Sequence, residues 1–293
     1  MVAKKVLVVG LLKVDSGKTT FSRCLITTLK ERGLGIVPFK PLSGHNFYYQ
    51  WAMTLKNVRK KRLFCHDIDK LAAAAQIQLP IELLNPVDRL LVPLDFEKYL
   101  RFPRRFFNHA EKIDALLLQR ISFVRNCRSL QLENVYLSNK SATSRVLWDP
   151  QGIKEILKGA DKVLEMEGLH QLVIYHTQHF EEATTAALKA LEDQAKWILI
   201  ESLNDIACPA PCAASADIVV AIVPGLALCY SPKDFFRTLN LQRQLKGKQR
   251  PIFMKELCPV IDPLWKIRLN FRTQTDKVGP EFEQISDYIV SSC

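Results

Sequence analysis

The sequence predicts an α/β fold built on a mainly parallel sheet with helices on both faces. Short apolar, β-branched runs alternate with helical patterns along the chain, which is typical of parallel sheets. The first such run, Lys5–Gly10, is followed by a loop and then by a helical pattern from Thr19 to about Glu31. The composition, 48% hydrophobic and 24% charged, is that of a globular protein and excludes a disordered chain, a collagen or a coiled-coil rod.

The rest of the chain continues this alternation. In chain order we expect a strand at Leu34–Lys40, a short strand at Leu172–Tyr175, a helix from Phe180 to Ala195, strands at Trp197–Glu201 and Ile218–Val223, a helix at Asp234–Leu245, strands at Pro251–Met254 and Leu264–Leu269, and a helix at Pro280–Val290. The stretch Phe96–Lys140 is basic and aromatic and contains no motif that we can name. We therefore expect residues 1–293 to form one domain with an inserted lid or subdomain around residues 96–165.

Charge and cysteine content limit the class of protein. Lys and Arg number 41 against 30 Asp and Glu, a net charge of +11, and the longest uncharged stretch, Ile218–Pro232, is shorter than the roughly 20 residues that span a membrane. We therefore expect no membrane contact. A chain of this length needs no disulfides for its core, so its eight cysteines favour a reducing, cytoplasmic setting. Cys208 and Cys212 alone are close enough to suggest a metal or redox pair, with loop packing as the alternative.

Two clusters hold part of the basic excess. Lys56–Arg62 contains five cations, and Arg101, Arg104 and Arg105 alternate with phenylalanines. Basic residues beside aromatic rings can hold a nucleic-acid backbone and stack its bases. The alternatives are a solvated loop and a counter-charge for an anionic nucleotide, so nucleic acid stays open as a partner.

The strongest local signal is Gly17-Lys18-Thr19-Thr20, between the first strand and the first helix. This context predicts a P-loop NTPase fold, in which backbone N–H groups and a helix N-terminus surround phosphate oxygens. Lys18 would reach the β- and γ-phosphates and Thr19 would ligate Mg²⁺. The usual first glycine of the motif is replaced by Leu12. The expected nucleotide-binding residues are Lys13, Val14, Asp15, Ser16, Gly17, Lys18, Thr19 and Thr20.

A second lysine and an acid complete the expected chemistry. Lys40 ends the second strand, so it should face the phosphate loop and stabilise phosphoryl charge or hold a substrate, together with Ser43. His45 is either a proton carrier or an ordinary hydrogen-bonding residue. Glu201 ends the strand Trp197–Glu201, where an acid could hold Mg²⁺ or its waters. The next candidate acids are Asp205 and Asp67, with Asp69 as the alternative to Asp67.

The order of these landmarks resembles the dethiobiotin synthetases, which belong with the MinD/ParA ATPases to the SIMIBI P-loop proteins. The resemblance rests on GKTT, Lys40-Pro41 with Ser43-Gly44, the Asp67 helix start, Asn85-Pro86, the strand ending at Glu201, and Ala216–Gly225. It implies ATP and Mg²⁺ as cofactors, Lys18, Lys40 and Glu201 in catalysis, and Thr19, Asp67 and Glu201 around the metal. Ser202-Leu203-Asn204-Asp205 replaces the glycine-rich segment that follows the glutamate in that family, so the acceptor is left open.

Two function classes follow. One is an ATP-dependent ligase or phosphoryl-transfer enzyme acting on a small-molecule acceptor, with a polynucleotide 5′-kinase as a variant. The other is a MinD/ParA-like ATPase switch, a homodimer or a binder of a partner protein, in which Lys13 would cross the dimer interface. A degenerate, non-catalytic relative stays open as well. The chain contains no Asn-Lys-x-Asp motif that would read guanine, which favours adenine.

Overall fold

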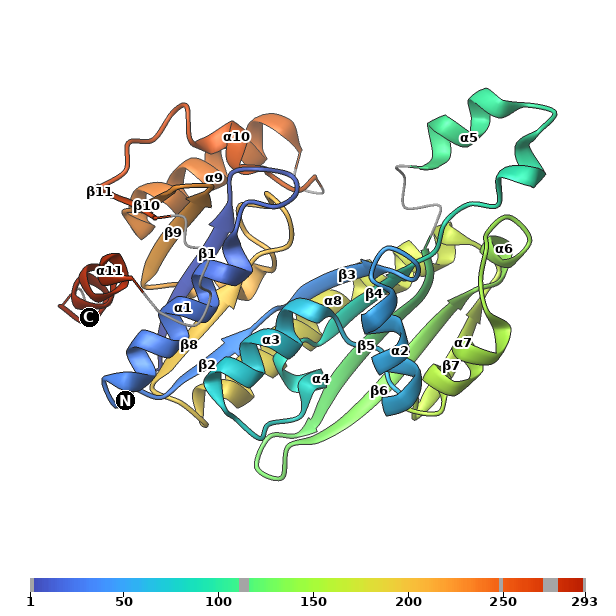
Figure 1. Cartoon of the computed structure of the whole chain (residues 1–293), viewed down its shortest axis with the longest axis horizontal. Helices are drawn as coiled ribbons and strands as arrows, with labels where there is room; N and C mark the ends of the chain where they lie inside the picture. The colour runs from blue at the N-terminus through green and yellow to red at the C-terminus, as the bar shows by residue number, and fades with distance from the viewer. Residues whose placement is uncertain (1–2, 111–115, 248–249, 271–278, 292–293) are drawn as a thin grey trace. The chain divides into compact units, whose positions relative to one another are not determined.

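The computed structural model describes residues 3–110, 116–247, 250–270 and 279–291, which belong to two compact units (Figure 1). The first unit contains residues Met1–Pro41, Asp67–Leu79 and Leu191–Cys293. The second contains Leu42–His66 and Pro80–Ala190. The sequence predicts one domain with an insertion around residues 96–165. The second unit includes that stretch but already begins at Leu42.

The first unit is built on a six-stranded sheet in the order β11-β10-β9-β1-β8-β2. Its strands are β1 (Lys4–Gly10), β2 (Ile36–Phe39), β8 (Trp197–Glu201), β9 (Ile218–Val223), β10 (Leu226–Tyr230) and β11 (Trp265–Arg268). The four strands from β9 to β2 are parallel, and β1 lies between β8 and β9. Because parallel strands end at the same edge, Gly10 and Glu201 reach that edge together.

The second unit is built on a five-stranded sheet in the order β3-β4-β5-β6-β7. Its strands are β3 (Leu42–Asn46), β4 (Val87–Leu91), β5 (Leu116–Asn126), β6 (Gln131–Asn139) and β7 (Lys162–Met166). The outer pairs β3–β4 and β6–β7 are parallel, and the pairs that involve β5 are antiparallel.

The expectation of a mainly parallel sheet is wrong, because both sheets are mixed. In the first unit only Pro224 and Gly225 connect β9 to β10, and so short a connection joins antiparallel strands. Gly225 has a φ of 81°, a conformation that glycine adopts readily. In the second unit the short turn from Cys127 to Leu130 joins β5 to β6 in the same way.

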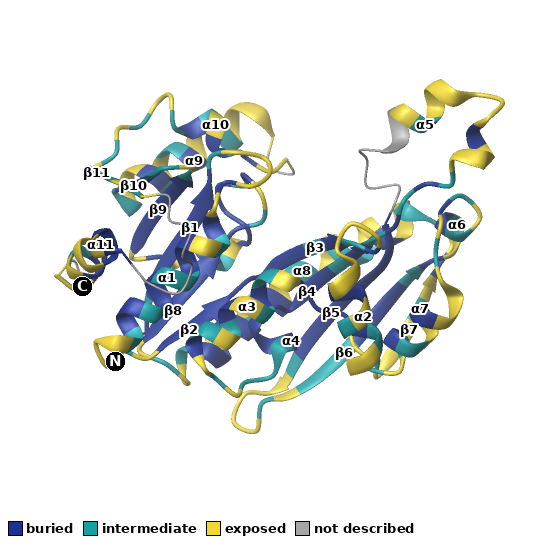
Figure 2. Ribbon diagram, in the orientation of Figure 1, coloured by how far each residue is buried: buried dark blue, intermediate teal, exposed yellow. Residues whose placement is uncertain are grey.

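The helices of the first unit are α1 (Lys18–Glu31), α3 (His66–Ala75), α9 (Pro232–Lys246), α10 (Met254–Leu257) and α11 (Pro280–Ser291), with a 3-10 turn, η3, at Pro211–Ser215. α1 packs on one face of the sheet, where Phe21 and Leu25 join Val6 and Val8 in a buried core. α11 extends this core through Phe282, whose ring lies 5.4 Å from that of Phe21. Figure 2 shows the buried strands between more exposed helices.

The helices of the second unit are α2 (Trp51–Lys60), α4 (Ile81–Leu84), α5 (Pro103–Ala110), α6 (Lys140–Thr143), α7 (Pro150–Leu157) and α8 (Leu169–Glu192), with a 3-10 turn, η1, at Phe96–Tyr99. A separate hydrophobic core lies under them, with Leu63, Leu90, Leu118 and Tyr136 fully buried. Each unit therefore has its own core. The last two residues of α8 belong to the first unit.

Two of the expected strands are wrong. Leu172–Tyr175 lies inside α8, and its β-branched Val173 and Ile174 expose 41% and 43% of their surfaces on that helix. Pro251–Met254 forms only an isolated bridge between Phe253 and Ile206, after which α10 begins at Met254. The expected helices at 234–245 and 280–290 are confirmed as α9 and α11, and the strand at 264–269 as β11. No helix within the described ranges has both the length and the apolar character to cross a bilayer.

Candidate functional site

The loop Leu11–Gly17 connects the end of β1 to the start of α1, and hydrogen bonds hold it in place. The Leu11 N–H donates to the carbonyl of Ile222 at 2.9 Å, which ties the loop to β9. The Ser16 hydroxyl donates to the Leu12 carbonyl at 2.8 Å and accepts from the Leu12 N–H at 3.0 Å. Asp15 and Gly17 have φ values of 53° and 84°. Such left-handed residues curl a backbone into the concave form that binds anions.

Gly10 gives the loop its close approach to the end of β1. A Cβ at this position would lie 2.6 Å from Ser16 Oγ, 2.8 Å from Lys18 Nζ and 2.9 Å from the Asn204 carbonyl oxygen. No side chain fits among these atoms without displacing the loop. Gly10 precedes the position of the usual first motif glycine by two residues, and its role here is to admit the Ser16 and Lys18 side chains.

Lys18 is buried at the start of α1, with 8% of its surface exposed. Burial lowers the pKa of its ammonium, the charge of Lys40 lowers it further, and Glu201, Asp67 and Asp205 oppose the shift. A buried cation at a helix N-terminus is poorly compensated until an anion arrives. The arrangement therefore suits a phosphate group beside Lys18.

Lys40, at the end of β2, lies between two acids. Its ammonium donates to Glu201 Oε1 at 2.7 Å and lies 2.9 Å from Asp67 Oδ2. Lys40 and Glu201 are almost fully buried, whereas the Asp67 side chain is 40% exposed. Burial tends to raise the pKa of Asp67, but the charge of Lys40 and its hydrogen bond to Asp67 outweigh the effect of burial and hold that pKa below its usual range. Asp67, the first of the two candidate acids in α3, therefore forms an ion pair with Lys40.

Thr19 and Glu201 offer a partial set of metal ligands. The Thr19 hydroxyl donates to Glu201 Oε1 at 3.1 Å, and Glu201 Oε2 is buried without a hydrogen-bond partner. A buried carboxylate oxygen without a donor is chemically suited to a cation. The described residues contain no group of three or more His, Cys, Asp or Glu that could hold a metal. Two carboxylates and a hydroxyl fit Mg²⁺, which commonly takes its other ligands from waters and substrate phosphates.

The other expected nucleotide residues lie in the loop or in the first turn of α1 and are open to solvent. Lys13, Val14, Asp15 and Thr20 are exposed, and Val14 exposes 65% of its surface. Asp205 is buried and influences Lys18, but among the described contacts its carboxylate does not pair with Lys40. The structure thus brings Lys18, Thr19, Lys40, Asp67 and Glu201 together and leaves Asp205 at their margin.

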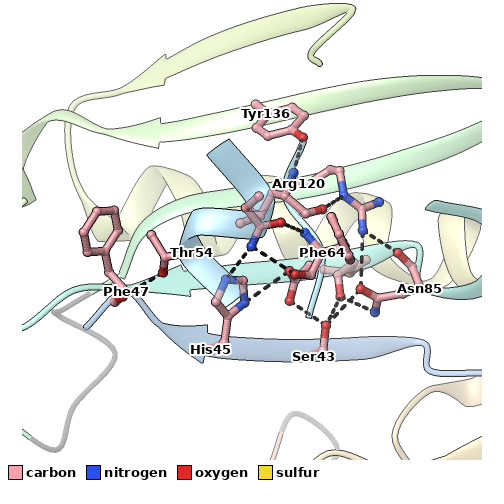
Figure 3. A network of polar contacts seen from close by, with 12 residues as sticks. Ser43, His45, Phe47, Thr54, Phe64, Asn85, Arg120 and Tyr136 are labelled. Carbon is pink, nitrogen blue, oxygen red and sulfur yellow. Dashed lines mark hydrogen bonds and ion pairs between the residues drawn. The ribbon is translucent and has the colours of Figure 1, made fainter. Parts of the chain in front are cut away.

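Ser43 and His45 belong to the second unit and take part in a different network (Figure 3). The Ser43 hydroxyl lies 2.5 Å from Asp88 Oδ1 and 3.0 Å from Asn85 Oδ1. His45 Nδ1 lies 3.4 Å from Asp88 Oδ2, and its Nε2 faces the Asn57 amide nitrogen at 3.1 Å. All these groups are buried. Because Ser43 bonds to the acid and not to the histidine, this is no nucleophile–base arrangement.

Arg120 is the central cation of this network, and sequence reasoning missed it. It is fully buried and donates to the carbonyls of Leu63 at 2.8 Å and Asn85 at 2.7 Å. Burial tends to raise the pKa of Asp88, but His45, Arg120 and the Ser43 hydrogen bond outweigh it, so that pKa lies below its usual range. The only sequence signal was the presence of the charged residues Asp88 and Arg120 next to apolar residues in their strands. The network holds β3, β4 and β5 together, which gives Ser43 and His45 a structural role.

The remaining basic and cysteine candidates are also placed. Arg101, between η1 and α5, is exposed, as are Arg104 and Arg105 in α5, and the Arg105 guanidinium lies over the Phe102 ring at 4.9 Å. Among the described cysteines there is no disulfide. Burial raises the pKa of Cys208, whose thiol donates to the carbonyl of Ala210 at 3.1 Å. That contact favours loop packing over a reactive pair.

No protein-family model and no curated protein matches this chain.

Proposed function

We propose that this protein binds ATP with Mg²⁺ at the loop Leu11–Gly17 and is a phosphoryl-transfer enzyme or ATP-dependent ligase. The observation that carries the proposal is the convergence of two lysines, two acids and a hydroxyl at this loop. Lys18 is buried at the start of α1, and Lys40 lies within 3 Å of both Glu201 and Asp67. Few structural roles require so many charges at one strand edge.

Each residue of this site has a separate role in the proposed reaction. Lys18 would meet the β- and γ-phosphates, and Lys40 would stabilise the group that is transferred. Thr19, Asp67 and Glu201 would hold Mg²⁺, which neutralises phosphate charge when bound. Glu201 Oε2, which is buried without a donor, is the atom best prepared for that cation. Adenine is the proposed base because the guanine-reading motif is absent from the sequence.

We also propose that the acceptor differs from the acceptor of the dethiobiotin synthetases. The segment after Glu201 closes onto the sheet, since the Ser202 N–H donates to the Val8 carbonyl at 2.9 Å and the Ser202 hydroxyl to the Ile206 carbonyl. Asn204 takes a left-handed conformation with a φ of 49°. This segment therefore differs in sequence and in side-chain size from the glycine-rich segment of the dethiobiotin synthetases, which lets a substrate approach the backbone.

A switch of the MinD/ParA kind is the second candidate, and the exposure of Lys13 favours it. The Lys13 side chain lies on the open part of the loop, where a second copy of the chain could meet it. Such a protein would hydrolyse ATP without an acceptor and would dimerise when ATP is bound.

The proposal is tested by measuring phosphate release from ATP with the full chain, alone and with panels of amine, carboxylate and hydroxyl acceptors. Acceptor-dependent turnover that Glu201→Gln removes would support the enzyme. Acceptor-independent turnover that Lys13→Ala abolishes would support the switch. ATP binding without any turnover would contradict both activities.

A further inference from the structure

The outward face of α2 combines dense positive charge with exposed aromatic rings. Residues 51–62 contain five cations, Lys56, Arg59, Lys60, Lys61 and Arg62, and no acid. Arg59, Lys60 and Lys61 are exposed, while Arg62 lies 3.3 Å from Glu82. We call Tyr48, Tyr49, Trp51, Arg59, Lys60 and Lys61 the α2 surface.

α7 extends the positive charge beside α2. A Cβ on Gly159, after α7, would lie 2.1 Å from the Lys61 carbonyl oxygen, so the two segments touch. Lys154 and Lys158 lie in and directly after α7, and the only acid of that helix, Glu155, pairs with Lys158 at 2.6 Å. Lys154 therefore adds to the positive charge around Lys61.

The aromatic part of the α2 surface lies at the other end of the helix. The rings of Tyr48 and Trp51 are nearly parallel, at 14°, with centroids 6.0 Å apart. They expose 44% and 47% of their surfaces, and Tyr49 exposes 84%. Buried Phe47 meets Trp51 edge-on at 5.8 Å, which fixes the orientation of the indole. Flat rings held in place and open to solvent are suited to stacking on other planar groups.

The inward face of α2 is anchored by the polar network of Figure 3, so the α2 surface is presented on a fixed support. The Thr54 hydroxyl donates to the Phe47 carbonyl at 2.7 Å. Asn57 donates to the Phe64 carbonyl at 3.1 Å, accepts from the Phe64 N–H at 2.9 Å and faces His45. These contacts place Asn57 and Thr54 inward and turn Trp51 and Arg59 outward.

We propose that the α2 surface binds single-stranded nucleic acid. Cations at one end would meet phosphates, and rings at the other would stack on bases; the ten residues of α2 separate the two by roughly 15 Å, within reach of one strand. A membrane surface is a less suitable partner. Met53 of α2 is buried and Val58 is half-buried, so Trp51 and Leu55 are the exposed large apolar side chains of this helix. A duplex fits less well too, because its bases are stacked on one another.

The proposal is tested with the full chain by fluorescence anisotropy of a labelled 20-nucleotide single strand over a series of salt concentrations. The test variant replaces Arg59, Lys60 and Lys61 with alanine. The matched control replaces three exposed cations elsewhere in the second unit, Arg128, Lys162 and Lys189, with alanine. Both variants lose three charges, and thermal unfolding checks that each is folded.

We expect the wild-type chain to bind the single strand more tightly than a duplex of the same length. The Arg59/Lys60/Lys61 variant should bind at least tenfold more weakly. The slope of log K against log salt should become less steep by about 2, since each phosphate contact on a single strand contributes about 0.7 to that slope. The control should bind within about twofold of wild type.

The aromatic rings are tested separately by Trp51→Ala and Tyr49→Ala, the second of which removes a side chain with little packing. Either should weaken binding at least threefold with an unchanged salt slope, because stacking involves no counterions. The proposal is overturned if the wild-type chain binds no single strand, if the control loses as much affinity as the test variant, or if the chain binds only vesicles containing phosphatidylserine.

Discussion

Lys40 and Glu201 form an ion pair of 2.7 Å in which both side chains are almost fully withdrawn from solvent. The two residues lie at the ends of neighbouring parallel strands, β2 and β8. Removing one partner of such a buried pair strongly destabilises the folded protein, because the other charge is left buried and unpaired. Asp67 and Thr19 complete the cluster, so we expect these four side chains to act as a unit.

We predict that Lys18→Ala abolishes nucleotide binding, because it removes the buried cation that would meet the β- and γ-phosphates. Affinity should fall at least a hundredfold by calorimetry, on the order of 3 kcal/mol. Lys233→Ala, which removes an exposed lysine of the same unit in α9, is the matched control and should bind nearly as wild type. Unchanged affinity in Lys18→Ala would remove the phosphate-loop interpretation.

We predict that Glu201→Gln spares ATP binding measured without Mg²⁺ but lowers turnover about a hundredfold, because the neutral amide is a poor metal ligand. Steady-state phosphate release measures the rate, and calorimetry measures the affinity. Asp205→Asn, a buried acid on the same segment, should change the rate little. A full rate in Glu201→Gln together with a loss in Asp205→Asn would transfer the role to Asp205.

We predict that Gly10→Ala damages the loop, because the added Cβ would come within 3 Å of Ser16 Oγ, Lys18 Nζ and the Asn204 carbonyl. Overpacking of this kind costs about 1–3 kcal/mol of stability, and nucleotide affinity should fall at least tenfold. Gly35→Ala is the control, since its Cβ would meet nothing within 4 Å. Equal behaviour of the two variants would show that the close approach at Gly10 has no consequence.

We predict that Asp88→Asn destabilises the protein by about 3 kcal/mol at pH 7, because it leaves Arg120 and His45 without their buried acid. The folded-state pKa of Asp88 lies below its ordinary value of 3.8. The stability that Asp88 contributes is therefore complete above that value and is lost as the pH falls through the lower, folded-state pKa. Urea unfolding should show a constant difference from wild type between about pH 5 and 7, which narrows below about pH 4.

The control for Asp88 is Glu167→Gln, which removes an exposed acid of the second unit that lies 3.6 Å from Lys140. It should change the free energy of unfolding by less than about 0.5 kcal/mol. A difference for Asp88→Asn that grows on acidification would contradict the assignment of a charged Asp88.

Local signals predicted much of the first unit. β1, β8 and β9 are short apolar runs with polar residues or glycine at their ends, and α1 follows a glycine-lysine pair, so each could be predicted from about ten residues of sequence. The proximity of Lys40 and Glu201 followed from the rule that parallel strands end at one edge. The Pro224-Gly225 turn was visible in the sequence, but the antiparallel β10 that it produces was not predicted.

The second unit was harder to predict because its pattern depends on tertiary contacts. β5 buries Leu116–Phe123 without alternation, including Gln119, Arg120 and Ser122, so its polar residues concealed the strand. The partners of Arg120 are backbone carbonyls of Leu63 and Asn85, which are distant in sequence. No periodicity could reveal them. For the same reason the buried polar partners of Ser43 and His45 could not be predicted.

The central claim is that the loop Leu11–Gly17 binds ATP with Mg²⁺, and calorimetric titration of the full chain with ATP and GTP, each with and without Mg²⁺, tests it most directly. We predict ATP binding that Mg²⁺ strengthens at least tenfold and that GTP does not match. Absence of binding by either nucleotide would contradict the claim and would mean that the residues in place of the usual motif, Leu12 to Asp15, do not support a phosphate site.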